Sequence, residues 1–222
     1  MQAYIGVLFT TYRRTDTAIR TILGIRNHLK SGPELVWYLA DDGSEEPHTA
    51  ACWNALEGAV LASAHSERMS VGAGMNKGVS SLLRSTDLIL TLEDDWELPQ
   101  DFDISPYVDL LEREPSIGMV RLGGLPVGLD LRSVGYFGRH YLEVQKTTQY
   151  AFSGNPSLRH RRFFEAYGPY PVGLTPGETE IVYDAVIRAA PGPTIVWPVE
   201  IGGWGPFSHI GMQRYEEYAH EL

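Results

Sequence analysis

Residues 4–44 read YIGVLFTTYRRTDTAIRTILGIRNHLKSGPELVWYLADDGS and contain two apolar runs on either side of a helical pattern. Residues 4–10 and 35–40 are short apolar runs, which predicts two strands. Between them, residues 15–30 carry the pattern of an amphipathic helix. Apolar side chains recur there at steps of three and four residues, namely Ala18, Ile22, Ile25 and Leu29. A strand, a helix and a strand in this order predict a βαβ unit and a mainly parallel sheet.

The same alternation continues along the chain, so we expect one compact domain of the α/β class. Further strands are predicted over residues 59–64, 87–92, 118–122, 136–144 and 194–199. Further helices are predicted over residues 47–56, 75–83, 104–113, 157–167 and 176–190. Three tryptophans within these elements are expected in the core: Trp37, Trp53 and Trp197. Arg159, Arg161 and Arg162 are expected on a solvated helix face.

The composition restricts the class of protein. The 222 residues include 18 basic and 28 acidic side chains, and the formal charge of −10 disfavours a nucleic-acid backbone or an anionic membrane as partner. A modified nucleic-acid base stays open as an acceptor. Cys52 is the only cysteine, which excludes a disulfide framework and a multi-thiolate zinc site and favours a cytoplasmic protein. We expect no membrane span and no secretory signal, because the apolar runs have only strand length.

Polar residues follow three of the predicted strands, at the edge where parallel sheets bind ligands. They are Thr10-Thr11-Tyr12-Arg13-Arg14, Asp41-Asp42-Gly43-Ser44 and Glu93-Asp94-Asp95. Asp-Asp-Gly-Ser alone is also typical of a turn with a helix cap. The third group opens a cluster of six carboxylates, Glu93, Asp94, Asp95, Glu97, Asp101 and Asp103. Such a cluster suits Mg²⁺ or Mn²⁺ bound together with substrate phosphates, and a solvated acidic loop is the alternative.

The order of these motifs resembles that of family 2 glycosyltransferases with the GT-A fold. The resemblance extends across nearly the whole chain and is carried by residues 5–14, 40–44, 72–78, 92–99, 152–168 and 177–188. It implies a single Rossmann-like GT-A domain over residues 1–222. The half over residues 1–97 would bind the nucleotide sugar, and the half over residues 98–222 would bind the acceptor and carry out catalysis. The implied reaction is metal-dependent transfer of a sugar to an acceptor hydroxyl, with inversion.

The resemblance also assigns contacts with the donor. Thr10 and Tyr12 would line the nucleoside pocket, and either Asp41 or Asp42 would accept a hydrogen bond from the base, which we expect to be uracil. The donor would therefore be a UDP-sugar. Further contacts with the nucleotide sugar are expected from Arg14, Arg68, Asn76 and Asp94.

The expected cofactor is Mn²⁺ or Mg²⁺, and by resemblance its main ligand is Asp95. Glu93 or Asp94 would assist, directly or through water. His209, in Pro206-Phe207-Ser208-His209-Ile210-Gly211, resembles a histidine that many GT-A enzymes supply to the same metal.

The catalytic base is expected within Gly177-Glu178-Thr179-Glu180, which departs from the family's Gly-Glu-Asp motif. Glu178 and Glu180 are both candidates. Glu178 shares a helical face with Ile181, Val182 and Ala185, and this face is expected to point toward the core and the cleft. We therefore prefer Glu178 as the base. Thr175-Pro176-Gly177-Glu178 also predicts a capping box, in which the Glu178 carboxylate accepts from the Thr175 N–H.

Two other functions fit parts of this pattern. A nucleotidyltransferase also combines a Rossmann-like half with metal-binding carboxylates, but residues 10–14 lack the glycine and lysine expected near a triphosphate. A non-catalytic nucleotide- or sugar-binding module would agree with the altered motif at residues 177–180. Hydrolysis of the donor in the presence of Mn²⁺ distinguishes an enzyme from such a module.

Overall fold

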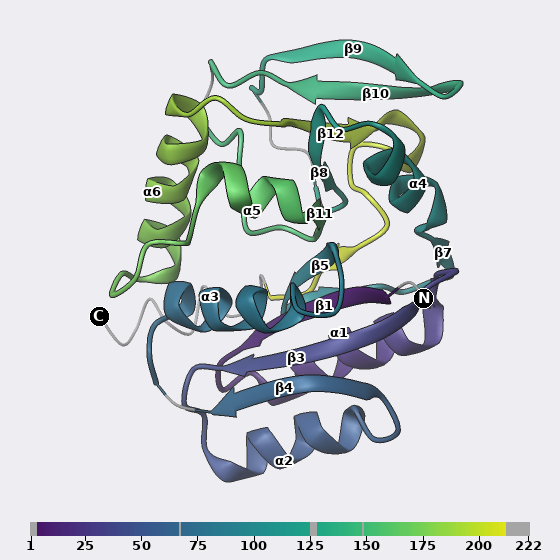
Figure 1. Cartoon of the computed structure of the whole chain (residues 1–222). Coiled ribbons are helices and arrows are strands. Elements are labelled where there is room, and N and C mark those ends of the chain that lie inside the picture. Colours follow the sequence, from purple (N-terminus) through teal and green to yellow (C-terminus); the bar gives the residue numbers. More distant parts are fainter. Residues whose placement is uncertain (1–3, 67, 125–127, 148, 212–222) are drawn as a thin grey trace.

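The computed structural model describes residues 4–66, 68–124, 128–147 and 149–211. Within these residues one nine-stranded sheet has the order β4-β3-β1-β5-β11-β8-β12-β10-β9 (Figure 1). Its strands are β1 (Tyr4–Thr11), β3 (Glu34–Asp41), β4 (Val60–Ser66), β5 (Leu88–Glu93), β8 (Ile117–Arg121), β9 (Leu131–Tyr136), β10 (Arg139–Val144), β11 (Ser157–His160) and β12 (Thr194–Pro198). The four strands from β4 to β5 pair in parallel, and β11 then pairs antiparallel to both β5 and β8. The predicted α/β class is confirmed.

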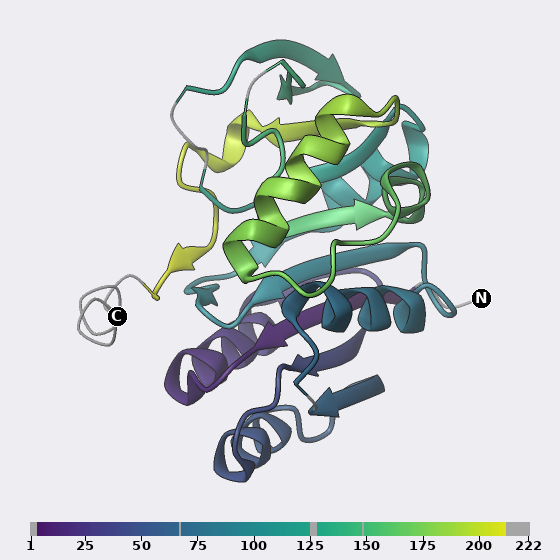
Figure 2. The same ribbon diagram turned by 90° about the vertical axis from the view of Figure 1, so that its left-hand side faces the viewer.

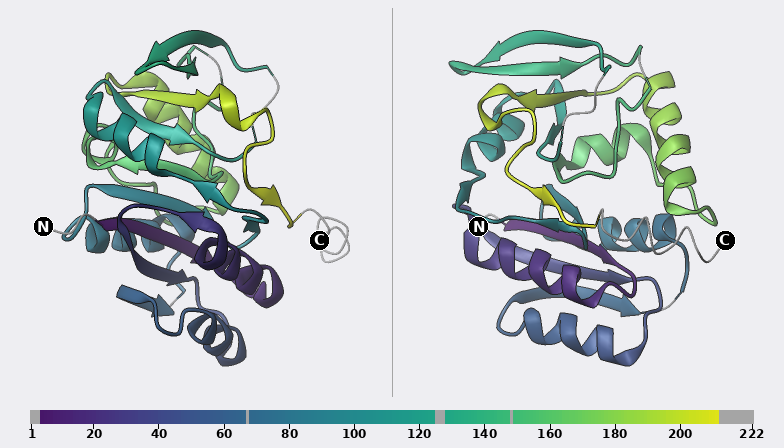
Figure 3. Two further views of the ribbon diagram at one scale, coloured as in Figure 1. Left: turned by 90° about the vertical axis from the view of Figure 1, so that its right-hand side faces the viewer. Right: turned by 180° about the vertical axis from the view of Figure 1, so that it is seen from behind.

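Helices cover both faces of this sheet (Figures 2 and 3). The helices are α1 (Thr15–His28), α2 (Glu46–Ala55), α3 (Val71–Leu82), α4 (Ser105–Arg113), α5 (Arg161–Tyr167) and α6 (Pro176–Ala189), with a short 3₁₀ turn η1 (Val199–Ile201). Buried side chains of α1, α2 and α4 join one apolar core, and those of α3, α5 and α6 join the other. The result is the three-layer arrangement of an α/β domain.

The alternation of side chains along β1 explains why both faces need helices. Ile5, Val7 and Phe9 belong to the core on the α1 side, whereas Leu8 belongs to the core on the α3 side, and all four are fully buried. Burial of each such side chain stabilises the fold by roughly 1.5–3 kcal/mol. A slip of one residue in register would exchange the two sets, so the register is strongly specified.

That register brings the polar strand ends together. Thr11 lies opposite Asp41 on β3, and Thr10 lies opposite Glu93 on β5. Because the three strands are parallel, their carboxyl ends meet at one edge of the sheet. The sequence prediction that these polar strand ends lie at one edge is therefore confirmed.

The structure corrects the predicted helix over residues 157–167. Its first four residues are β11, which pairs with β5 and β8, and only α5 is helical. Arg159 is fully buried rather than solvated, and its guanidinium lies 4.9 Å from the ring centroid of Phe152 and 5.6 Å from that of Phe163. Arg162 donates to three backbone carbonyl oxygens, of Leu111, Glu114 and Ile117. Apolar and backbone partners distant in sequence thus override the charge pattern.

Two smaller expectations also change. The strand predicted over residues 136–144 is broken, because the β9–β10 hairpin turns at Phe137 and Gly138 with φ values of 50° and 80°. Only β10 lies wholly within the predicted range. Trp37 and Trp197 are core residues as predicted, but Trp53 on α2 is 39% exposed.

Two short ladders lie outside the main sheet. β2 (Leu29–Lys30) pairs with β7 (Phe102–Asp103), and β6 (Trp96–Glu97) pairs with β13 (Ser208–His209). The second ladder returns the late part of the chain to the end of β5. Among the residues described, no helix has the length and apolar character needed to cross a membrane.

Candidate functional site

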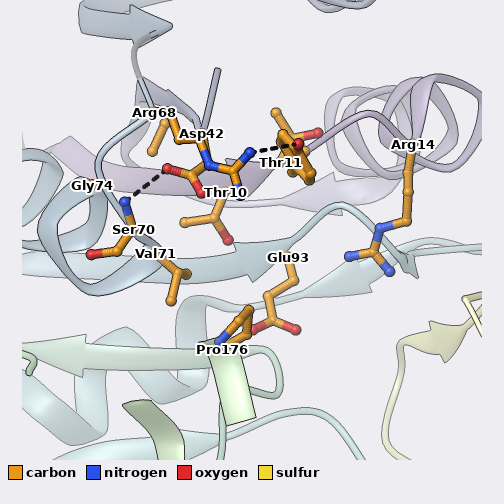
Figure 4. Close-up of a pocket in the computed structure, with 12 residues that line it drawn as sticks. Thr10, Thr11, Arg14, Asp42, Arg68, Ser70, Val71, Gly74, Glu93 and Pro176 are labelled. Atoms are coloured by element: carbon orange, nitrogen blue, oxygen red, sulfur yellow. Dashed lines mark hydrogen bonds between the residues drawn. The ribbon is translucent and has the colours of Figure 1, made fainter. Parts of the chain in front are cut away.

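A pocket of about 250 Å³ opens at the carboxyl ends of β1, β3 and β5 (Figure 4). It is lined by Thr10, Thr11, Tyr12, Arg14, Ala40, Asp42, Arg68, Ser70, Val71, Gly74, Glu93 and Pro176. The ends of β1, β3 and β5, together with the segment from β4 into α3, therefore form most of the pocket, and α6 contributes one wall through Pro176. Open α/β sheets bind ligands at this position.

Tyr12 and Arg68 form the aromatic side of the pocket. The Arg68 guanidinium lies 5.7 Å from the Tyr12 ring centroid, and its Nη1 donates to the Tyr12 hydroxyl over 3.5 Å. The Arg13 guanidinium lies 4.9 Å from the same centroid. The tyrosine ring is therefore held beside two cationic groups.

The structure separates the two aspartates that end β3. Asp41 is fully buried, and its carboxylate accepts from the backbone N–H and, over 2.5 Å, from the hydroxyl of Ser44. Asp42 lines the pocket, and its Oδ1 accepts from the backbone N–H groups of Met69 and Ser70 at 2.9 and 3.0 Å. Asp41 thus supports the turn, and Asp42 faces the pocket.

Asp94 is a buried anchor rather than a pocket-lining group. Its Oδ2 accepts from the Thr11 hydroxyl at 2.8 Å and from the Tyr12 N–H at 3.1 Å. Burial raises the pKa of Asp94 to about 6, although the nearby Arg14 charge and the Thr11 hydroxyl act in the opposite direction. Asp94 therefore holds the backbone that presents Tyr12.

Arg14 bridges the two aspartates that follow β5. Its guanidinium forms ion pairs with Asp94 Oδ1 and, at 2.5 Å, with Asp95 Oδ2. Burial opposes the charge of Arg14, but the two carboxylates outweigh it, and the pKa of Arg14 is raised. The Arg14 guanidinium therefore supplies a positive charge next to the acidic end of β5.

His209 reaches the same carboxylate from the other end of the chain. Its Nε2 lies 3.3 Å from Asp95 Oδ2, and its ring packs against that of Trp96 at a tilt of 34°, with 4.7 Å between the centroids. Burial opposes ionisation of Asp95, but His209 and Arg14 together hold its pKa below the ordinary value. A Cβ atom at Gly211 would lie 2.3 Å from Asp95 Oδ2, so only glycine fits there.

Asp95 and His209 could hold a divalent cation only if phosphate oxygens or water supplied its other ligands. Asp95 Oδ1 is buried and has no hydrogen-bond partner among the residues that the structure describes, and His209 lies beside the other oxygen. In the described part of the chain no three His, Cys, Asp or Glu side chains form a group that could hold a metal, so Glu93 does not complete the predicted set. One carboxylate and one imidazole leave most coordination positions to phosphate oxygens and water, which is usual for Mg²⁺ and Mn²⁺ sites.

Glu93 instead faces Glu180 across Gly154. The Gly154 N–H donates to Glu180 Oε1 at 3.0 Å, and a Cβ atom at Gly154 would lie 2.7 Å from Glu93 Oε1. Burial, followed by the charges of Asp95 and Glu180, raises the pKa of Glu93 to about 8. Two carboxyl groups therefore meet at one glycine beside the pocket, and at neutral pH Glu93 tends to carry a proton.

Arg121 holds the loop that presents Gly154. It is fully buried, and its guanidinium donates to the carbonyls of Tyr150 and Ala151 and, at 2.5 Å, to the Ser153 hydroxyl. Burial lowers its pKa to about 10, whereas the Glu180 charge acts to raise it. Neither Arg121 nor Gly154 was a candidate in the sequence, because nothing local distinguishes them from other arginines and glycines.

The face of α6 differs from the expected one. Ile181 and Val182 are 58% and 42% exposed, and the buried side consists of Thr179, Tyr183, Asp184 and Ile187. The preference for Glu178 rested on the opposite orientation and is therefore wrong in its premise. Glu178 is exposed and forms the predicted capping box with Thr175, whereas Glu180 points toward Glu93 and Gly154.

Two other predicted donor contacts have different surroundings. The Asn76 amide donates to the Tyr170 carbonyl at 2.9 Å and accepts from the Tyr170 N–H at 2.8 Å, so it ties α3 to the segment before α6. Thr10 lines the pocket and donates to the Leu92 carbonyl. Of the predicted residues, the structure gathers Thr10, Tyr12, Arg14, Asp42, Arg68 and Glu93 around one pocket.

No protein-family model and no curated protein matches this chain. Solved structures do match it. A mannosyltransferase from Pyrobaculum calidifontis in complex with GDP-Man and Mn²⁺ superposes with a TM-score of 0.61 and 15% identity, over 87% of this chain and 54% of that one. S. aureus TarS in complex with UDP-GlcNAc gives 0.60 and 13%, over 87% and 57%. GalNAc-T7 with UDP, GalNAc and Mn²⁺ gives 0.59 and 15%, over 89% and 42%.

These matches confirm the predicted GT-A fold. The chain spans about half the length of the solved structures that it matches.

Proposed function

We propose that this chain is a glycosyltransferase that moves a sugar from a nucleoside diphosphate to an acceptor hydroxyl. One observation carries the proposal: a single pocket in a GT-A fold has an aromatic and carboxylate side, at Tyr12 and Asp42, and reaches the acidic strand end through Glu93 and Arg14. The Arg14 guanidinium pairs there with Asp94 and Asp95. Such a pocket offers separate places for a base and for a diphosphate. The similar structures contain GDP-Man, UDP-GlcNAc or UDP, which agrees with a donor of this class.

The nucleoside would lie on the side of Tyr12, with uracil as the base. The carboxylate of Asp42 would accept from the imide N–H of uracil, and Tyr12 with Arg68 would contact the faces of the ring. Asp41 has no role in this contact, because its carboxylate is buried under the turn at Ser44. The half of the chain over residues 1–97 supplies all of these groups.

The diphosphate would lie near Arg14, Asp95 and His209. A divalent cation held by Asp95 and His209 would neutralise the charge that develops on the departing diphosphate. Arg14 would leave the carboxylate of Asp95 and pair with phosphate oxygens, since a guanidinium binds phosphate well in a bidentate manner. The ring of Trp96, which packs against the imidazole, would orient His209 for this role.

We propose Glu180 as the base that accepts the proton of the acceptor. The acceptor oxygen forms a bond to the anomeric carbon, the bond from that carbon to the diphosphate oxygen breaks, and its electron pair leaves with the nucleoside diphosphate. The hydroxyl proton passes to the Glu180 carboxylate, which the Gly154 N–H orients. Glu178 is less suited, since its carboxylate accepts from Thr175 at the exposed end of α6. Attack from the side opposite the diphosphate would invert the anomeric centre.

A panel of nucleotide sugars with and without Mn²⁺ tests the proposal. Thermal shift measures binding, and release of UDP in the absence of an added acceptor measures turnover against water. A UDP-sugar that raises the melting temperature and is hydrolysed with Mn²⁺ supports a transferase. Binding without any turnover would instead favour a binding module, and protection by nucleoside triphosphates alone would favour a nucleotidyltransferase.

A further inference from the structure

A buried histidine on α2 lies behind the pocket and takes no part in the proposed chemistry. His48 is 4% exposed and contacts two threonines from neighbouring elements. Its Nε2 lies 3.0 Å from Thr11 Oγ1 at the end of β1, and its Nδ1 lies 3.0 Å from Thr15 Oγ1 at the start of α1. The imidazole therefore joins both ends of the loop that carries Tyr12 and Arg14.

The direction of each hydrogen bond follows from the Asp94 carboxylate, with which the series of contacts from His48 through Thr11 ends. An ionised Asp94 can only accept, so the Thr11 hydroxyl donates to its Oδ2 over 2.8 Å. The Thr11 oxygen must then accept from His48, which places the proton of the imidazole on Nε2. Nδ1 becomes an acceptor for the Thr15 hydroxyl. Burial lowers the pKa of His48, which agrees with a neutral ring in this one tautomer.

The chain of hydrogen bonds ends on the groups that would contact the donor. Asp94 Oδ2 also accepts from the Tyr12 N–H at 3.1 Å, and Asp94 Oδ1 pairs with the guanidinium of Arg14. A change in the orientation of the Thr11 hydroxyl would therefore shift the Asp94 carboxylate, and with it the backbone of Tyr12 and the side chain of Arg14. Each bond in this series runs between elements distant in sequence, so it fixes tertiary geometry.

We propose that His48 is a positioning residue for the nucleotide site, acting through Thr11 and Asp94 on Tyr12 and Arg14. This inference rests on the proposed function, because it assigns the loop a nucleotide to bind. The sulfur of Cys52 lies 3.6 Å from the same Nε2. Burial raises the pKa of the Cys52 thiol to about 12, so it stays protonated and supplies no competing charge.

His48→Asn and His48→Gln form a matched pair of variants. The Gln side chain places an N–H donor about as far from the backbone as Nε2, whereas the Asn side chain ends one bond earlier and cannot reach Thr11. We expect His48→Asn to bind UDP about tenfold more weakly, and His48→Gln to stay within about threefold of the wild type. UDP titration by calorimetry with Mn²⁺ measures both. Equal affinity for UDP in a folded His48→Asn would overturn the proposal.

A second readout needs no nucleotide. Protection of the Tyr12 amide against hydrogen exchange should fall in His48→Asn and return in His48→Gln, and ¹⁵N spectra of the wild type should show His48 with its proton on Nε2. An unchanged Tyr12 amide, or a proton on Nδ1, would refute the positioning role. If the exchange result and the Nε2 proton are both observed but the wild type binds no nucleoside diphosphate, the proposed function fails while the positioning role of His48 stands.

Thr11→Val and Thr11→Ser provide the same comparison if the His48 variants do not fold. Valine has the shape of threonine but neither accepts from His48 nor donates to Asp94, whereas serine keeps the hydroxyl. Weaker UDP binding in Thr11→Val, with recovery in Thr11→Ser, is the expected result. Equal binding by the two variants would contradict the inference.

Discussion

The imidazole of His209 lies 3.3 Å from the carboxylate of Asp95, although 114 positions separate the two residues in the chain. The short β6–β13 ladder produces this contact, since His209 is the register partner of Trp96, the residue after Asp95. An acidic strand end and a histidine thus meet where a diphosphate and its cation would bind in the proposed reaction.

Mn²⁺ should strengthen UDP binding to the wild type, and Asp95→Ala should remove that dependence, because one protein ligand and the metal's main negative charge are lost. Calorimetry with and without Mn²⁺ measures the coupling. Asp101→Ala is the matched control, since Asp101 belongs to the same acidic stretch but is exposed and pairs with His28 and Lys30. Equal UDP affinity with and without metal in the wild type would sink the assignment.

Arg14→Gln should change the affinities for metal and nucleotide in opposite directions. Without the guanidinium, Asp94 and Asp95 lose their internal cation, so Mn²⁺ alone should bind more tightly, while UDP should bind at least several-fold more weakly. Titration with Mn²⁺ alone and with UDP separates the effects. Arg20→Gln removes an exposed ion pair with Glu97 and should leave both unchanged. Weaker Mn²⁺ binding in Arg14→Gln would contradict this role.

Glu180→Gln should reduce the rate of sugar transfer by roughly 100-fold or more, with UDP binding nearly intact, because the amide cannot accept the proton. Glu178→Gln is the control from the same turn of α6, and its rate should match the wild type. Transfer is followed as release of UDP with each acceptor tested. Collapse in Glu178→Gln with full activity in Glu180→Gln would return the base to Glu178.

Asp42→Asn should weaken UDP binding, whereas Asp41→Asn should mainly lower the melting temperature. The amide at position 42 still has an oxygen to accept from Met69 and Ser70, so the fold should persist while UDP affinity and the preference for UDP over GDP fall. The buried Asp41 anchors Ser44, so Asp41→Asn should lower the melting temperature more. Better protection of the wild type by GDP than by UDP would show that the base is misassigned.

His160→Asn should flatten the acid limb of the stability profile. His160 caps α5 by accepting from the Arg162 N–H, and burial, with the Arg162 charge, lowers its pKa from 6.5 to about 4. A depressed pKa contributes stability above pH 6.5 that is lost as the pH falls toward 4. Asn keeps a capping oxygen but does not titrate. Melting temperatures between pH 7 and 4 should therefore fall less steeply in the variant, and parallel curves would refute this cause.

Local patterns in the chain were enough to predict several features. The βαβ unit over residues 4–44 follows from apolar runs and a helical period, and the capping box of Thr175 and Glu178 follows from residues three positions apart. Asp41-Asp42 and Glu93-Asp94-Asp95 follow strands that are parallel, so their meeting at one edge needed only the order of the strands. The motifs that resemble a glycosyltransferase are of this local kind.

The partners of these residues were decided by the folded chain. Arg14 forms ion pairs with Asp94 and Asp95. Glu180 rather than Glu178 turns toward Glu93, because α6 packs through Tyr183 and Ile187. Arg159 is buried among aromatic rings despite its charged neighbours in sequence. Periodicity reports which residues share a face, but the packing of other elements determines which face is covered. Contacts such as that of His209 with Asp95 depend on the register of strands more than a hundred residues apart, and no local preference encodes that register.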